Sequence, residues 1–204
     1  YQRVLEEYEA AMKYSADFSS GRYNLGNLYA KLDRPTDAIE QYEAAIRIDE
    51  QFYPAAVNLA HLYNRTGRNP EAEKLLRETV TRHPELYDVA YTLGLLLVEM
   101  QEYQQAVTFL EQAARGLPAR ARIHYNLGLL YQMLQSVPQA ENALRTALSL
   151  EPQHLEYQYG LVDHYLKRGL FEKARPIAED MASMHPDEPI GAQILEYIRK
   201  NTGG

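Results

Sequence analysis

Residues 23–30 read YNLGNLYA, and residues 125–132 read the closely similar YNLGLLYQ. The central leucines of the two phrases are 102 residues apart, which is three times 34. Related phrases stand at the other steps of 34 residues: VNLAHLYN at 57–64, YTLGLLLV at 91–98 and YGLVDHYL at 159–166. A fixed period of this length is the signature of a repeat architecture, in which each unit is one supersecondary motif stacked on the next.

The period divides most of the chain into five units of 34 positions each: 19–52, 53–86, 87–120, 121–154 and 155–188. Position 7 is always Leu and position 20 is always Ala, while position 8 is Gly or Ala in four units and position 11 is Tyr in four. Positions 4, 7, 8 and 11 share one face of a helix, and positions 20, 24 and 27 share one face of a second helix. Small residues at positions 8 and 20 allow two helices to cross closely, and Pro at position 32 ends the second helix. The pattern therefore predicts antiparallel helix pairs joined by short turns.

Incomplete units are expected at both ends. Residues 1–18 have the pattern of a second helix from a truncated unit, and residues 189–200 have the pattern of one more first helix. Glu196 and Arg199 stand where the small residue and the Tyr should pack, so we expect a polar capping helix without a following partner. Residues 201–204 are expected to form a disordered tail. Because the sequence does not begin with Met, we expect it to be part of a longer protein.

A 34-residue helix–turn–helix with L-G-x-x-Y, then Ala and then Pro resembles the tetratricopeptide repeat over almost the whole chain. The resemblance implies an all-α fold, a right-handed α-solenoid of antiparallel helix pairs with about twelve helices, which forms a single domain over residues 1–204. It also implies a non-catalytic protein–protein interaction module rather than an enzyme.

The resemblance implies protein or peptide partners, and the composition argues against several other classes. The net charge of −7 disfavours a nucleic-acid binder, and no apolar run approaches the ~20 residues that membrane insertion requires. There is no cysteine, and none of the six histidines forms an i,i+4 pair of the kind that binds metals. Phosphate-binding and nucleophile motifs are absent as well, so we expect neither a cofactor nor a metal. The pattern leaves cytoplasm and bacterial periplasm equally open as compartments.

In the resembling family, positions 2, 5, 6, 9, 12 and 13 of the first helices line a concave groove that usually binds peptides. Tyr stands at position 5 in four units and offers a large contact area at low entropic cost. Asn stands at position 6 in three units and can donate to and accept from an extended backbone, similar to the asparagine ladder of O-GlcNAc transferases. The expected groove residues are Tyr23, Asn24, Asn27, Asn58, His61, Arg65, Tyr91, Leu95, Tyr125, Asn126, Leu129, Met133 and Tyr159.

Other interpretations of these residues remain open. The Tyr and Asn side chains would also fit a purely structural role between neighbouring helices. A clamp of the type that holds chaperone C-termini is not expected, because Asn27 and Asn58 match it but its three cations are missing. A second hypothesis is a structural assembly domain, a homo-oligomer that associates through convex faces or an exposed edge of the array. A third is an array appended to an upstream catalytic or multihaem domain, because VNLAHLY and LGLLLVEM look like segments that follow such haem domains.

Pro176 stands at position 22, inside the second helix of the last full unit. Its ring removes one backbone hydrogen bond and crowds the preceding turn. We therefore expect this helix to kink, or to begin late, near Ala174–Arg175.

Overall fold

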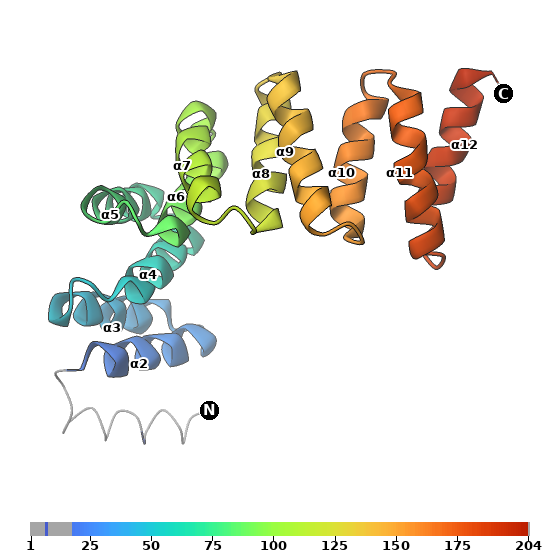
Figure 1. Ribbon diagram of the computed structural model, residues 1–204. Coiled ribbons are helices and arrows are strands. Elements are labelled where there is room, and N and C mark those ends of the chain that lie inside the picture. Colours follow the sequence, from blue (N-terminus) through green and yellow to red (C-terminus); the bar gives the residue numbers. More distant parts are fainter. Residues whose placement is uncertain (1–6, 8–17, 204) are drawn as a thin grey trace. The chain divides into compact units, whose positions relative to one another are not determined.

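The structure, a computed structural model, describes residue 7 and residues 18–203, and the regular secondary structure of this part of the chain consists of α-helices alone (Figure 1). The first helices of the units are α2 (Ser19–Lys31), α4 (Tyr53–Arg65), α6 (Tyr87–Glu99), α8 (Ala121–Met133) and α10 (Leu155–Leu166), followed by α12 (Ile190–Thr202). The second helices are α3 (Pro35–Ile48), α5 (Asn69–Arg82), α7 (Tyr103–Gly116), α9 (Val137–Leu150) and α11 (Phe171–Met184). The all-α expectation is confirmed for the described residues. The helix expected within residues 1–18 lies almost wholly outside them.

The chain separates into two compact units, one ending at Glu102 and the other beginning at Tyr103. In the first unit, the helices from α2 to α6 each pack against the next one in the chain. In the second unit, the same holds for the helices from α7 to α12, and Figure 1 shows α8 to α12 side by side. Each unit therefore contains stacked helix pairs of the kind that the 34-residue period predicts. The single domain over residues 1–204 stays a prediction.

Position 20 is the most tightly enclosed place in the repeat. All five alanines there are 0% exposed. These residues are Ala38, Ala72, Ala106, Ala140 and Ala174. A larger side chain has no room where the second helix crosses the first, which explains why the same residue type recurs at this position.

Position 15 lies in the turn between the two helices of every 34-residue repeat, and its role is not evident from the hydrophobic pattern. The five residues there all adopt a left-handed backbone: Asp33, Gly67, Gln101, Gln135 and Gly169 have φ between 55° and 76°. In each repeat, the backbone amide of position 16 donates a hydrogen bond to the carbonyl of position 11. In the second repeat, this bond joins Arg68 N to Tyr63 O at 2.8 Å. This is the Schellman arrangement that satisfies the last carbonyls of a helix. Gly adopts this conformation without steric cost, whereas Gln101 and Gln135 adopt it with strain.

Two details near the C-terminus correct the sequence-based expectations. The late start expected for this helix is wrong, because α11 begins at Phe171 and helical geometry continues past Pro176 to Met184. The kink expected near Ala174–Arg175 stays a prediction. The proline removes one hydrogen bond, but the remaining turns are held by tertiary packing of Ala174, Ala178 and Met181, which are all 0% exposed. The disordered tail expected over residues 201–204 is wrong for residues 201 and 202, because α12 extends to Thr202. Residue 204 lies outside the described residues.

Candidate functional site: the groove of the first helices

In the first unit, the floor of the groove between first helices is made by a residue of a second helix. A Cβ atom on Gly26 would lie 2.6 Å from Cε1 of Tyr42. The missing side chain therefore makes room for the Tyr42 ring, which passes beside α2 and is only 2% exposed. Its hydroxyl emerges on the side of the first helices and donates to Asn27 Oδ1 at 2.8 Å.

This hydroxyl belongs to a network of four side chains from three helices. Asn58 Nδ2 on α4 donates to Asn27 Oδ1 at 2.8 Å and to the Tyr23 hydroxyl at 3.2 Å. Both amide hydrogens of Asn58 are thus used within the protein, so the structural role that the sequence left open applies to this residue. Burial raises the pKa of Tyr42 above its ordinary value of 10, so its hydroxyl keeps its proton and remains a donor at neutral pH.

Above this network lies an open pocket of about 470 Å³ between α2 and α4. Its lining includes Lys31, His61 and Arg65, together with Asn27, Asn58 and the edge of Tyr42. His61 is exposed, and the Arg65 guanidinium is 3.5 Å from the Asp33 carboxylate in a solvent-exposed pair. Since the lining contains three basic side chains and no carboxylate, the pocket is suited to a polar or acidic ligand group.

The other groove residues expected in this unit do not line this pocket. Asn24 is exposed but does not line the pocket, while Tyr91 and Leu95 lie half-buried on α6. The structure therefore brings Asn27, Asn58, His61 and Arg65 together. Sequence reasoning missed Tyr42, because it assigned position 24 entirely to the core between helices.

In the second unit the same crossing has an apolar side chain. A Cβ atom on Gly128 would lie 2.6 Å from Cγ of Leu144, which occupies position 24 as Tyr42 does in the first unit. Leu144 is 0% exposed and has no hydroxyl to present to the groove. The residue at position 9 changes with it, from Asn27 in the first unit to Leu129 in the second.

Tyr125 corrects one of the sequence-based site assignments. Its side chain is 6% exposed, because it folds down onto α10, where a Cβ atom on Gly160 would lie 2.6 Å from its Cε2. The ring also packs on Tyr157 with centroids 5.0 Å apart. Tyr125 is therefore part of the hydrophobic core and does not present an exposed anchor to a ligand.

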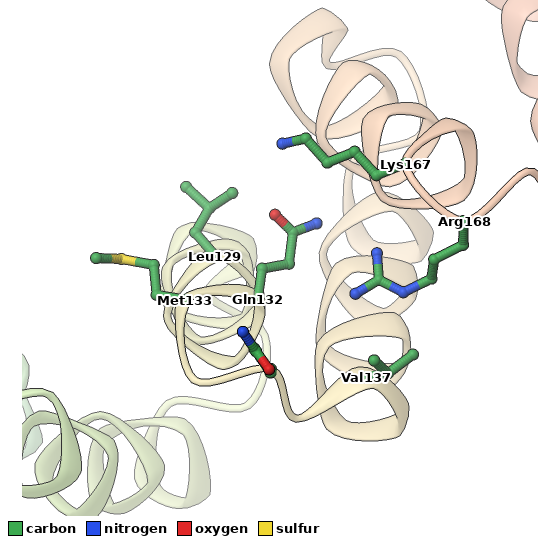
Figure 2. A pocket seen from close by; sticks show the side chains of 7 residues that line it. Leu129, Gln132, Met133, Val137, Lys167 and Arg168 are labelled. Atoms are coloured by element: carbon green, nitrogen blue, oxygen red, sulfur yellow. The ribbon is translucent and has the colours of Figure 1, made fainter.

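A larger open pocket, of about 730 Å³, lies at the turn edge of the second unit (Figure 2). Figure 2 shows Gln132 on α8 directed toward Lys167 and Arg168 at the end of α10, while Leu129 and Met133 project from the outer side of α8. The remaining lining residues are Gln135 in the turn and Val137 at the start of α9. Met133 is 54% exposed and Val137 is 37% exposed, so the pocket combines accessible apolar surface with two cations.

Lys167 also lines a second pocket, of about 350 Å³, between α10 and α12. The other residues there include Asp163, Leu166 and Tyr197. Tyr197 is 50% exposed and comes from the capping helix, so α12 contributes surface as well as covering the end of the array. The Lys167 ammonium is 2.7 Å from the Asp163 carboxylate between the two pockets.

A buried histidine lies behind the larger pocket. Gln132 Nε2 is 3.1 Å from Nδ1 of His164, which is 0% exposed, and the other ring nitrogen has no hydrogen-bond partner within the described part of the chain. Burial lowers the pKa of His164 below its ordinary value of 6.5, and the nearby Arg168 lowers it further. The ring is therefore neutral at physiological pH.

Some residues around the larger pocket are predictable from the repeat pattern, and others are not. Of the expected residues, Leu129 and Met133 line the larger pocket, Tyr159 is 45% exposed, and Asn126 is half-buried. The residues that were missed are Gln135, Val137 and Arg168. Gln135 and Arg168 lie in turns and Val137 is the first residue of α9, and a helical wheel of the first helices assigns a face to none of them. The glycines at position 15 of two repeats, Gly67 and Gly169, are the sequence signal that marks these turns.

Metal sites and membrane-spanning helices are both absent from residue 7 and residues 18–203. No group of three or more His, Asp or Glu residues in that part of the chain is placed to hold a metal ion. No helix there is long and apolar enough to cross a membrane.

Comparisons with known proteins agree with this architecture. One model of the tetratricopeptide repeat matches residues 32–95 and 135–196, which is more than half of the chain. A second model of the same repeat matches residues 1–52 and 91–138. Comparison with curated protein sequences gives no significant match.

Several solved structures share the fold. YrrB, described as a TPR protein with an unusual peptide-binding site, aligns with a TM-score of 0.71 at 18% identity over 93% of this chain and 97% of its own. MamA from Desulfovibrio magneticus RS-1 aligns with a TM-score of 0.73 at 18% identity over 83% of this chain and 96% of its own. Yeast Tom70 aligns with a TM-score of 0.72 at 17% identity over all of this chain and 44% of its own. At these identities the likeness shows the fold alone.

Proposed function

Because the chain belongs to the tetratricopeptide repeat family, we propose that it is a non-catalytic binding module that holds segments of a partner protein against its first helices. The family repeat serves protein interaction, and both matching models belong to it. Support from a relative comes from YrrB, which is described as having a peptide-binding site.

The observation that carries this proposal is the presence of open pockets on first helices in both units. In the first unit the pocket is lined by Lys31, His61 and Arg65 above the asparagine pair, which suits a polar or acidic segment. In the second unit Leu129 and Met133 provide apolar contacts, which suit a segment with two or three apolar anchors. Exposed aliphatic side chains in a pocket of this size are typical of ligand-binding surfaces.

Affinity should be about micromolar, corresponding to ~8 kcal/mol, because ordering a flexible peptide offsets much of the contact energy. Truncating Leu129 to Ala should weaken binding by ~1–3 kcal/mol, as expected of an apolar anchor, without unfolding the chain. Its side chain is only half-buried, so the fold depends on it less than on Tyr125. Tyr125 is unsuitable for this test because its loss would disturb the core.

The experiment is an affinity pull-down followed by titration of the captured partner's peptides, with wild type, Leu129→Ala and His61→Ala. Glu78→Ala is the matched control, because Glu78 is exposed on the second helix α5. We expect the two groove variants to lose partners and the control to keep them. Retention by both groove variants together with loss by Glu78→Ala would contradict the proposal.

Two alternatives are distinguished by separate measurements. Self-association would appear as a mass that rises between two concentrations in light scattering. An array that serves an upstream catalytic or multihaem domain would be identified from the full-length gene. Both alternatives leave the groove variants without effect on peptide binding.

A further inference from the structure

We propose that the pocket at the turn edge of the second unit binds a segment of another protein in which an apolar side chain stands close to a carboxylate. This inference rests on the proposed function, because it names the chemistry of the segment that one part of the groove would hold. The pocket has two chemically different walls, and each wall sets a requirement for the occupant.

The first wall is apolar and accessible. Leu129 and Met133 stand one helical turn apart on α8, so their side chains lie on the same face. Val137 lines the pocket from the start of α9, on the side of Arg168 (Figure 2). Met133 is 54% exposed although it is an unbranched apolar residue that packs readily into an interface. A single Leu, Met or Phe side chain of a partner would remove this surface from water.

The second wall is cationic. Lys167 and Arg168 follow α10, and Figure 2 shows both side chains directed toward α8 across the pocket. No carboxylate is among the lining residues. Lys167 is paired with Asp163 at 2.7 Å, but the Arg168 guanidinium donates only to the carbonyl of His164 at 2.8 Å, and the described residues provide no ion pair for it.

Charge complementarity therefore favours a carboxylate at this wall. Arg offers several donors in a planar fork that matches a carboxylate, and one bond to a backbone carbonyl leaves others for a ligand. Gln132 lies between the two walls and can donate to or accept from a peptide backbone. The pocket volume of about 730 Å³ accommodates an apolar side chain together with a neighbouring Asp or Glu.

The test begins with selection of twelve-residue peptides from a random phage library on the full chain. Fluorescein-labelled copies of the winning peptides are then titrated by anisotropy. We expect the winners to pair an apolar residue with Asp or Glu within three positions. We also expect Met133→Gln and Lys167→Gln each to weaken binding by at least fivefold, and Arg168→Gln by at least tenfold.

Charge reversal makes the test specific. Arg168→Glu should abolish binding of the acidic winners and restore it for copies in which the Asp or Glu is replaced by Lys. Lys74→Glu is the matched control, because Lys74 is an exposed cation on α5 in the first unit, and it should leave every titration unchanged. Unchanged melting curves of the pocket variants show that the fold is retained.

The outcomes separate the two proposals. If winners lose affinity on His61→Ala or Tyr159→Ala but are indifferent to Met133→Gln and Arg168→Gln, the pocket inference is overturned while the binding module stands. If winners depend on Met133 but carry no acidic residue, or if the pocket variants instead abolish association of the chain with itself, the proposed occupant is wrong. If no peptide depends on any residue of the first helices, both proposals fail.

Discussion

Tyr42 and Leu144 occupy the same position of the repeat in the two units, yet they give the groove opposite chemistry. Each packs where a Cβ atom on the facing glycine, Gly26 or Gly128, would lie 2.6 Å away. The phenol of Tyr42 reaches through to Asn27, whereas Leu144 ends inside the core. One substitution in the second helix therefore changes the floor of a surface that is otherwise built by first helices.

The comparison also explains two different fates of tyrosine at position 5. In the first unit, the residue at position 6 of the next repeat is Asn58, which donates to the Tyr23 hydroxyl at 3.2 Å and holds the ring half-buried. In the second unit that position is Gly160, which leaves space for Tyr125 to fold into the core. The placement of the position 5 side chain thus depends on a residue 35 positions further along the chain, and closely similar first helices do not form the same surface.

The largest effect should follow from removing the apolar floor. Leu144→Ala should lower the free energy of unfolding by ~2–5 kcal/mol, because a fully buried side chain leaves a cavity. Urea denaturation followed by circular dichroism measures this change. Leu150→Ala on the same helix is the control and should change stability by less than ~0.5 kcal/mol, because Leu150 is 38% exposed. Equal losses for the two variants would show that the floor does not depend on Leu144.

The glycines at the two crossings should differ in tolerance. Gly128→Ala should lower the free energy of unfolding by ~1–2 kcal/mol, because the new Cβ atom meets both Cγ of Leu144 and its backbone nitrogen, the latter at 3.2 Å. Gly26→Ala should lose about half as much, since the nearest atoms all belong to the Tyr42 ring, which can tilt toward the groove. Thermal and urea unfolding of both variants measure the difference. A larger loss for Gly26→Ala would reverse this view of the two crossings.

The polar network of the first unit is tested by removing one hydroxyl. Tyr42→Phe should lower the free energy of unfolding by ~1 kcal/mol, because Asn27 loses a donor while the packing of the ring remains. Tyr53→Phe on α4 is the control, because Tyr53 is half-buried without a hydrogen bond to its hydroxyl among the described residues. A crystal structure or an NMR spectrum of the Asn27 and Asn58 amides would reveal whether the network reorganises. Identical stability for both variants would indicate that the network contributes nothing.

Substitution of a turn residue should have a smaller effect on the free energy of unfolding, and one of opposite sign. Gln135→Gly should raise the free energy of unfolding by ~0.5 kcal/mol, because a left-handed Gln is strained and Gly relieves more than it loses in chain entropy. Asp33→Gly at the same position of the first unit should change stability less, since Asp tolerates this conformation better. Melting temperatures of the two variants decide between them. A destabilised Gln135→Gly variant would mean that the side chain contributes contacts that outweigh its strain.

Much of the fold was predictable because it depends on spacing alone. The 34-residue period predicted the helices from α2 to α12, and the alanines at position 20 are all fully buried. The candidate site was less predictable, because the helical wheel shows which face a residue occupies and not what lies beneath it. The wheel position of Tyr125 predicts a place on the groove surface, whereas the absence of a side chain at Gly160 leaves space for its ring in the core. Gln135 and Arg168 lie in turns and Val137 begins α9, so a helical wheel of the first helices includes none of these three residues.

The smallest effect we expect is a difference in pH dependence between the two grooves. The network of the first unit contains only Tyr and Asn, whereas His164 lies behind the pocket of the second unit next to Gln132. Burial and the nearby cations Arg168 and Lys173 lower the pKa of His164, although Glu141 and Asp163 oppose this shift. In the unfolded state His164 takes up its proton at the ordinary pKa of 6.5, whereas in the folded state it does so at a lower pH. Just below pH 6.5 the unfolded state therefore holds more protons than the folded state. The free energy of unfolding therefore rises with pH there, so the contribution of His164 is complete above pH 6.5 and is lost as the pH falls toward the lowered folded pKa.

Urea midpoints at several pH values between 7.5 and 5 should fall less for His164→Asn, which keeps an acceptor for Gln132, than for wild type. His61→Asn in the exposed groove of the first unit is the control and should follow wild type, and an identical pH dependence of all three chains would remove His164 as the source.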